Sequence, residues 1–224
     1  MRPYRLLTAV IVAAGLWLPS SAFATHIQPG AYHESDVGAC TLNFVYDGAG
    51  GPYIGTAAHC VERVGDDVRD EAGAVFGDVA AIGDADETAT DWALIRVRPE
   101  FVSHVNPAMK GHPQYPTGVT TAAQTSIGDR IQLSGYGVGF DLTPTTREQR
   151  SAVLTFDDTE TYEVLATLIF GDSGGPLVQI ATGRALGIVS RLCIGLCEEE
   201  GPTVQGILAK AAAAGFDVSV RTVG

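Results

Sequence analysis

Short apolar or alternating runs recur along most of the chain, and glycine, proline and small polar residues separate them. Runs of about four to eight residues bounded by such turn residues are typical of β-strands. Many short strands of this kind favour an all-β barrel or sandwich over a helical or mixed fold. The pattern predicts strands over Thr41–Tyr46, Val75–Ile82, Trp92–Val97, Arg130–Ser134, Ala152–Phe156, Leu177–Ile180 and Ala185–Ser190.

One stretch near the end of the chain departs from this strand pattern. Val204–Ala214 is rich in alanine and is followed directly by Gly215, which suits the left-handed residue that closes many helices. Hydrophobic patterning therefore predicts an all-β protein with a short C-terminal helix.

The first residues indicate export. Arg2 and Arg5 precede an apolar run over Leu6–Leu18, and Ala22–Ala24 forms a small-residue cleavage site, which is the layout of a signal peptide. The apolar run has about 13 residues, fewer than the ~20 that span a bilayer. We therefore interpret residues 1–24 as a signal peptide and expect a secreted, extracellular protein without membrane attachment after cleavage.

The charge balance narrows the classes of partner. The chain has a formal net charge of −12. An acidic surface repels phosphate backbones and anionic lipids, so we expect neither nucleic acid nor membrane as a partner.

Four cysteines lie in the part of the chain that would be exported: Cys40, Cys60, Cys193 and Cys197. An even number in an oxidising compartment predicts two disulfides, and proximity favours Cys40–Cys60 and Cys193–Cys197 among the three possible pairings. A zinc site built from the four is the alternative, although their spacing lacks the paired short loops with histidines that such sites use. We expect no metal.

Three motifs bring candidate chemistry: Thr56–Cys60 around a histidine, Asp91–Ile95 where an aspartate opens an apolar run, and Gly171–Leu177 around a serine. A serine hydroxyl becomes a nucleophile when a histidine removes its proton and a buried carboxylate orients that histidine. These roles fall to Ser173, His59 and Asp91, which we predict to be catalytic. The backbone N–H groups of Gly171 and Ser173 would form the oxyanion hole.

The same motifs are similar to the signatures of the chymotrypsin-like serine proteases, and the bacterial, streptogrisin-like branch fits best. The segments Cys40–Phe44, Gly187–Ser190 and the C-terminal stretch from Pro202 also resemble that branch. The resemblance implies two six-stranded antiparallel β-barrels, over about residues 40–110 and 118–224, within a peptidase domain at 40–224. Residues 25–39 would then be an N-terminal extension or a short propeptide.

The resemblance also assigns roles to single residues. His59 and Asp91 would lie on the first barrel and Ser173 on the second, and the Cys40–Cys60 bridge would hold the loop that bears His59. Ser190 would donate a hydrogen bond to Asp91 and offer its backbone to substrate. An extended polypeptide substrate that adds as a strand, a monomeric enzyme and no cofactor are the corresponding expectations. The alternative is an inactive homologue that serves as a secreted binding module.

The chain departs from relatives whose mature chain begins with Ile-Val-Gly-Gly, because that motif is absent. The aspartate beside the nucleophile, Asp172, therefore needs an internal cation, for which Arg130, Arg147 and Arg150 are candidates. No cysteine directly precedes the serine motif, so Cys193 and Cys197 are expected to close a small local loop.

Counting along the family pattern gives a specificity prediction. The position six residues before the nucleophile is Thr167, which is neutral, so a preference for arginine or lysine is not expected. Leu192 and Thr203 would be bulky walls that shorten the pocket. We expect a preference for small apolar residues, such as alanine or valine, before the scissile bond.

The remaining histidines are expected on the surface rather than as ligands: His26, His33, His104 and His112.

Overall fold

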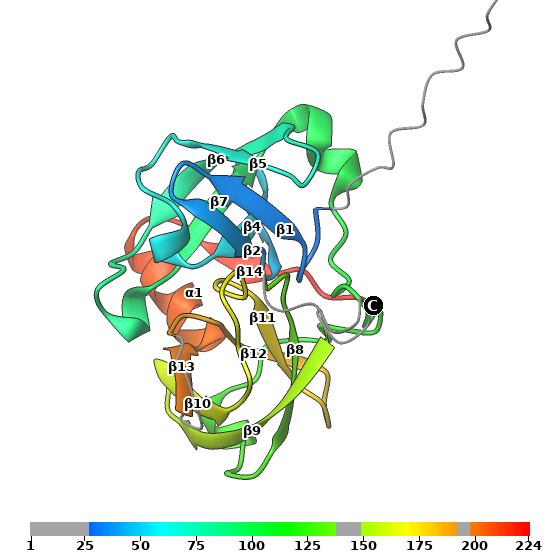
Figure 1. Cartoon of the computed structure of the whole chain (residues 1–224), viewed down its shortest axis with the longest axis vertical. Helices are drawn as coiled ribbons and strands as arrows, with labels where there is room; N and C mark the ends of the chain where they lie inside the picture. Colours follow the sequence, from blue (N-terminus) through cyan, green and yellow to red (C-terminus); the bar gives the residue numbers. More distant parts are fainter. Residues whose placement is uncertain (1–26, 138–148, 192–197) are drawn as a thin grey trace, which may run out of the picture.

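The computed structural model describes residues 27–137, 149–191 and 198–224. Two antiparallel sheets dominate it, and they lie one above the other in Figure 1. The two-barrel, mostly β architecture expected from the sequence is thus confirmed. The predictions for residues 1–24, His26, Arg147, Leu192, Cys193 and Cys197 lie outside the described residues.

The first sheet has eight strands among the described residues rather than six, because the hairpin β1–β2 and the C-terminal β14 join it. Their spatial order is β14 (Val218–Val220), β3 (Val45–Gly48), β4 (Gly51–Thr56), β7 (Ala93–Val97), β6 (Val75–Ile82), β5 (Asp67–Arg69), β1 (Tyr32–Ser35) and β2 (Gly38–Thr41).

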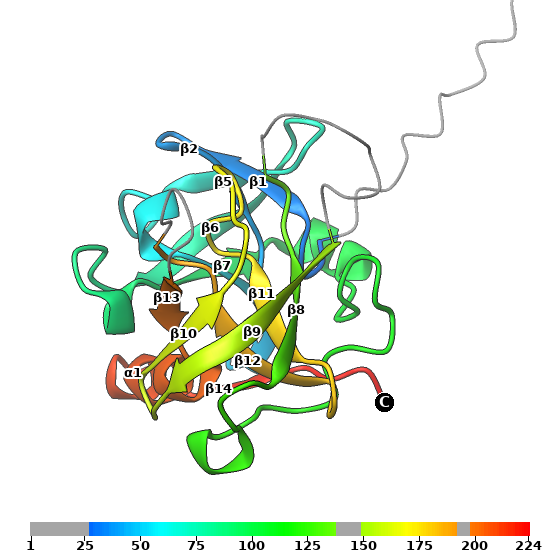
Figure 2. The same cartoon turned by 60° about the horizontal axis from the view of Figure 1, so that its bottom comes forward.

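The second sheet has six strands, and Figure 2 shows its long, curved hairpin β9–β10. The order is β12 (Arg184–Ile188), β11 (Pro176–Gln179), β8 (Arg130–Ser134), β9 (Gln149–Asp157), β10 (Thr161–Leu165) and β13 (Glu198–Pro202). Short 3₁₀ turns connect strands at Ala58–Cys60, Thr88–Thr90, Pro99–His104 and Ala122–Gln124.

Each sheet encloses its own apolar core, and a third core lies between them. Phe76 and Ile95 are buried inside the first sheet, and Leu133 and Val164 inside the second. The third core contains Phe44, Tyr46, Trp92, Ile188 and Ile207, among others, from both sheets and the helix. Because burial of apolar area is the main stabilising term, this shared core docks the two sheets and fixes the cleft between them.

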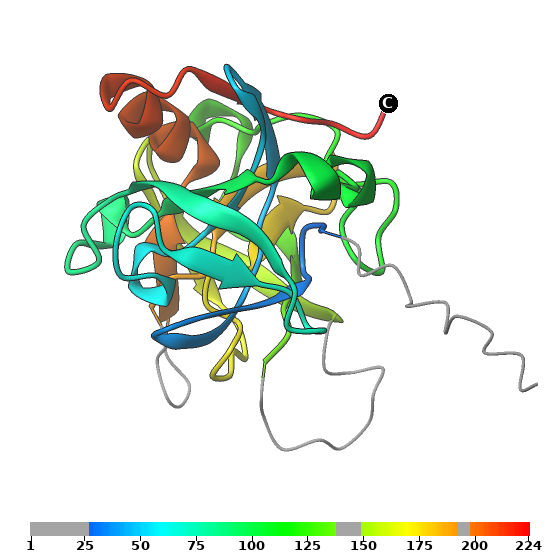
Figure 3. The same ribbon diagram turned by 90° about the horizontal axis from the view of Figure 1, so that it is seen from above.

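The predicted helix is present as α1 (Val204–Ala213). The side chain of Thr203 accepts a hydrogen bond from Gly206 N–H and caps its start, and Gly215 follows it with a φ of +91°. Figure 3 shows α1 on the opposite side of the molecule from the β1–β2 hairpin. No helix among the described residues is long and apolar enough to cross a membrane.

The segment before Cys40 is built into the first sheet. Ile27 is 2% exposed and forms a bridge with Val105, and β1 pairs with β2 so that His33 faces Cys40. The structure therefore places a strand of the first sheet on the N-terminal side of the expected domain boundary. The C-terminal strand β14 likewise belongs to the first sheet rather than the second.

Candidate active site

His59 and Asp91 are held together by two contacts. His59 lies in the 3₁₀ turn after β4, and Asp91, 1% exposed, follows the 3₁₀ turn Thr88–Thr90 two residues before β7. His59 Nδ1 is 2.8 Å from Asp91 Oδ2, and the His59 backbone N–H donates to Oδ1 at 3.0 Å. A carboxylate at Nδ1 favours the tautomer with the proton on Nδ1, which leaves Nε2 able to accept a proton.

The expected hydrogen bond from the Ser190 hydroxyl to Asp91 Oδ2 is present. Burial opposes ionisation of Asp91, but the hydrogen bonds and charge of His59 and the Ser190 hydroxyl outweigh it and lower the pKa of Asp91. The carboxylate is therefore charged at neutral pH and can stabilise a protonated His59.

Ser173 lies between β10 and β11, in a segment of two tight turns that we call the nucleophile turn (residues 169–175). The Asp172 N–H donates to the Ile169 carbonyl at 3.1 Å, and Gly171 has a φ of +96°. Positive φ at the third residue, with the second residue at negative φ, defines a type II turn and explains the glycine. Gly174 has a φ of +83° for the same conformational reason.

The cleft between the sheets brings Ser173 together with His59, Gly171 and Ser190 in one hollow of about 390 Å³. Ser173 is 7% exposed, and its hydroxyl makes no hydrogen bond to another described residue. Such contacts often tighten only when substrate binds. The backbone N–H groups of Gly171 and Ser173 likewise donate to no acceptor among the described residues.

Asp172 is fully buried and is paired with Arg150, one of the three expected candidates. Gly137 N–H donates to its Oδ1 at 3.0 Å and Ile169 N–H to its Oδ2 at 2.9 Å. Burial raises the pKa of Asp172, and Arg150 and the two N–H groups oppose that rise. Arg130 is exposed on β8 and makes no contact with Asp172.

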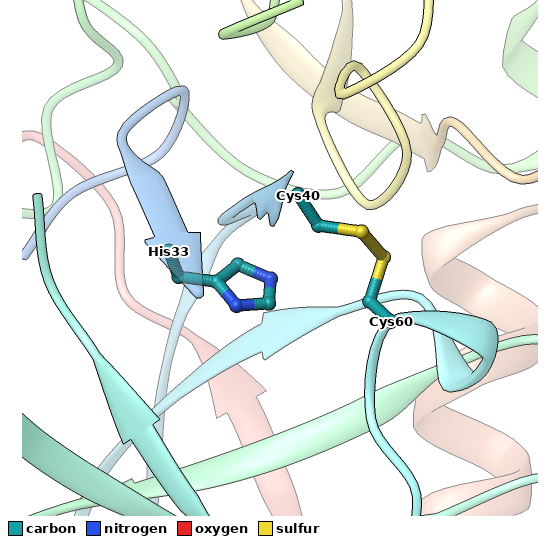
Figure 4. A group of neighbouring side chains, drawn as sticks. All are labelled: His33, Cys40 and Cys60. Carbon is teal, nitrogen blue, oxygen red and sulfur yellow. A yellow bond between two sulfur atoms is a disulfide. The ribbon is translucent and has the colours of Figure 1, made fainter. Parts of the chain in front are cut away.

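The Cys40–Cys60 disulfide is present and closes a loop with a sequence separation of 20. A cross-link of that span contributes about 3 kcal/mol by restricting the unfolded chain. It joins β2 to the turn that carries His59, as expected. His33 lies beside it (Figure 4), but both sulfur atoms are bonded to each other, so this group offers no thiolate to a metal ion.

The prediction that His33 lies on the surface is wrong. It is fully buried because β1 joins the first sheet with this side chain facing inward. Its Nε2 is 2.7 Å from Thr56 Oγ1, its Nδ1 has no hydrogen-bond partner among the described residues, and burial lowers its pKa to about 3. His104 and His112 are partly exposed.

Two of the residues expected to set specificity, Thr167 and Thr203, do not line this hollow. Thr167 is exposed and does not line it. The Thr203 hydroxyl caps α1, because it accepts from Gly206 N–H and donates to the Thr159 carbonyl. That hydroxyl thus acts both as a donor and as an acceptor within the protein.

Two groups of cleft residues could not be identified from the sequence. Val37 and Phe170, 50% and 67% exposed, line the hollow beside the disulfide. Arg191 lines a second hollow together with His59 and Ser190, and its guanidinium donates hydrogen bonds to the Thr88 hydroxyl and the Asp86 carbonyl. Val37, Phe170 and Arg191 carry no motif, and only the folded chain brings them beside the histidine.

Comparison with known proteins supports the expected family. A family model described as the trypsin-like peptidase domain matches residues 40–188. No curated protein sequence matches the chain.

Solved structures share the fold at low sequence identity. Nocardiopsis protease is 18% identical, with a TM-score of 0.63 over 88% of this chain and all of its own. Cellulomonas bogoriensis chymotrypsin is 19% identical, with a TM-score of 0.59 over 88% of this chain and all of its own. A glutamic acid specific serine protease that uses a histidine triad in substrate binding is 20% identical, with a TM-score of 0.62 over 87% and 100% of the two chains.

Proposed function

The chain belongs to the trypsin-like peptidase family, and from this premise we propose that it is a secreted serine endopeptidase acting through an acyl-enzyme intermediate. The observation that carries the proposal is the meeting of His59, Ser173 and Gly171 in one hollow, with His59 fixed by a buried carboxylate. Intact chemistry of this kind favours an enzyme over an inactive binding module.

The proposed reaction begins with Ser173. His59 Nε2 accepts the hydroxyl proton while Ser173 Oγ bonds to the carbonyl carbon of the scissile peptide, and the carbonyl oxygen becomes an oxyanion. The N–H groups of Gly171 and Ser173, free in the described structure, stabilise that charge. Protonated His59, stabilised by Asp91, then gives its proton to the departing amine.

The second half of the reaction releases the acyl group. A water molecule gives a proton to His59 Nε2 and its oxygen attacks the ester carbon of the acyl-enzyme. Collapse of the second tetrahedral intermediate breaks the bond to Ser173 Oγ, which recovers its proton from His59. None of these steps requires a cofactor.

The substrate is proposed to lie extended across the cleft. Its acyl portion pairs with the backbone at Ser190 and Arg191, at the edge of the second sheet, as in other strand-addition complexes. The departing portion would cross the hollow lined by Val37, Phe170 and the Cys40–Cys60 disulfide. The apolar character of those three groups favours an apolar residue on that side of the scissile bond.

The proposed preference for small apolar residues before the scissile bond rests on Thr167 and Leu192, since Thr203 caps α1. A hydrophobic pocket discriminates by about 1–3 kcal/mol per methylene, so the selectivity is expected to be modest. Cleavage of a peptide library measures it directly, and strong cleavage after arginine or phenylalanine would contradict it.

The proposed function is tested by labelling the purified protein with a fluorophosphonate, with the wild type beside Ser173→Ala. We expect labelling and casein cleavage by the wild type alone. A folded wild type that neither labels nor cleaves casein would favour the binding-module alternative.

A further inference from the structure

Thr41 joins the first sheet to the nucleophile turn. It is the last residue of β2 and is fully buried. Its backbone N–H donates to the Ser173 carbonyl at 2.9 Å, and its hydroxyl donates to the Gly171 carbonyl at 2.6 Å. Thr41 therefore anchors the carbonyl groups of the two residues whose N–H groups are proposed to form the oxyanion hole.

A third contact determines that the Thr41 hydroxyl is the donor in its hydrogen bond with the Gly171 carbonyl. The Tyr136 N–H donates to Thr41 Oγ1 at 2.9 Å, so the hydroxyl accepts from Tyr136 and its own proton is available for Gly171. One side chain thus links β2, the segment after β8 and the nucleophile turn.

The anchored carbonyl controls the peptide planes around Gly171. A type II turn changes to a type I turn when the peptide between its second and third residues rotates and the third residue leaves positive φ. That rotation would turn the Gly171 N–H away from the oxyanion. The hydrogen bond on the Gly171 carbonyl fixes the next peptide, between Gly171 and Asp172, so φ of Gly171 can change only together with a compensating change in ψ of Phe170.

We infer that Thr41 is a positioning residue whose side-chain hydroxyl holds the oxyanion hole in its binding conformation. This inference rests on the proposed function. The hydroxyl acts on the backbone of the turn and does not touch the reacting atoms.

Buried side chains behind Thr41 support its placement. The Thr56 hydroxyl donates to the Thr41 carbonyl at 3.1 Å, so it accepts from His33 Nε2 at 2.7 Å. His33, Thr56 and Thr41 thus form a chain of hydrogen bonds that runs from the inside of the first sheet to the nucleophile turn.

The test compares Thr41→Val, which keeps the shape and removes the hydroxyl, with Thr41→Ser, which restores the hydroxyl. Thr120→Val is the matched control, because Thr120 is 2% exposed and its hydroxyl bonds to no group in the part of the chain that the structure describes. The probe is a fluorophosphonate, measured as binding constant and maximal labelling rate. Amide hydrogen exchange of the nucleophile turn is followed in the same four proteins.

We expect Thr41→Val to lower the maximal labelling rate by about 10- to 100-fold with little change in probe binding, since small misplacements and lost oxyanion donors act on the reacting state. Thr41→Ser and Thr120→Val are expected to label like the wild type. Exchange in the nucleophile turn is expected to accelerate only in Thr41→Val.

Two outcomes separate this inference from the proposed function. Equal labelling rates in Thr41→Val and Thr120→Val, with casein still cleaved, would overturn the role of Thr41 and leave the protease intact. If the wild type neither labels nor cleaves casein, the proposed function fails, and the exchange comparison alone decides whether Thr41 orders the turn.

Discussion

Replacing Arg150 by methionine removes the cation that faces Asp172 while keeping much of the aliphatic volume. The Asp172 side chain is fully buried and that of Arg150 is 15% exposed, so the aspartate would be left as a buried, unpaired charge. Loss of one partner of a buried pair destabilises by about 3–5 kcal/mol. The N–H groups of Gly137 and Ile169 still bind the carboxylate and favour the lower end of that range.

A second argument limits the loss from above. The unpaired Asp172 can avoid a buried charge by taking a proton. Protonating a carboxyl group with an ordinary pKa near 3.9 costs about 4 kcal/mol at pH 7, so the loss of stability cannot exceed that cost. We therefore expect Arg150→Met to lower the free energy of unfolding by about 3–4 kcal/mol at pH 7, a large part of the ~5–15 kcal/mol of a typical domain.

The loss depends on pH in a defined direction. Without Arg150 the pKa of Asp172 in the folded protein rises further above its unfolded value, so the folded state keeps a proton that the unfolded state releases above about pH 4. The variant is therefore increasingly destabilised relative to the wild type as pH rises above about 4. The difference in stability shrinks again as pH falls toward 4.

Urea unfolding between pH 4.5 and 8, followed by the fluorescence of buried Trp92, measures both effects. Arg130→Met is the matched control, since Arg130 is exposed and does not contact Asp172. Adding Asp172→Asn to Arg150→Met removes the buried charge and is expected to recover most of the loss. Equal stability of the two methionine variants at pH 8 would refute the assignment of Arg150 as the partner of Asp172.

Two further predictions concern the site and its surroundings. The pKa of His33 is about 3 in the folded protein and about 6.5 in the unfolded chain, so at pH 5 protonation of the unfolded wild type lowers its free energy of unfolding by about 2 kcal/mol. His33→Gln removes this group, so the variant is expected to lose less stability on acidification than the wild type. Urea unfolding of both proteins at pH 7 and 5 checks this, and parallel losses would contradict it. Gly171→Ala is expected to slow fluorophosphonate labelling by about 100-fold or more, because alanine disfavours the φ of +96° and the turn would rotate its N–H out of the oxyanion hole. Gly73→Ala, at an exposed glycine with a φ of +80°, controls for backbone strain alone, and equal labelling of the two variants would argue against the hole.

Local patterning predicted several of the strands that bury one or both faces, although it missed the buried β4. Val75–Ile82 and Arg130–Ser134 match β6 and β8 residue for residue. Strands whose composition is polar were missed: β1 reads Tyr-His-Glu-Ser and β13 begins with three glutamates. β13 forms because β10 provides a partner over its whole length, a tertiary contact that outweighs propensity.

The same distinction separates the parts of the site that the sequence indicates from those it does not. His59, Asp91 and Ser173 lie in motifs whose residue types follow from the chemistry, and their meeting in the cleft could be anticipated. Arg150 could not be chosen among three arginines, because its approach to Asp172 depends on the pairing of β9 with β8, where it stands opposite Leu133. Counting along a family pattern does not reveal that Thr203 caps a helix.

The origin of the groups that fix the nucleophile turn bears on whether the enzyme needs an activating cut. Asp172 is already neutralised by Arg150 from β9, and the turn is already anchored from the first sheet by Thr41. A newly formed N-terminal amine would have no unpaired carboxylate to neutralise at Asp172. Cleavage after residue 39 would instead remove β1, whose His33 and Ser35 contact Thr56 and the Cys60 carbonyl behind the site. The structure therefore favours an enzyme that gains its active conformation when the two sheets dock, with β1 retained in the active protein.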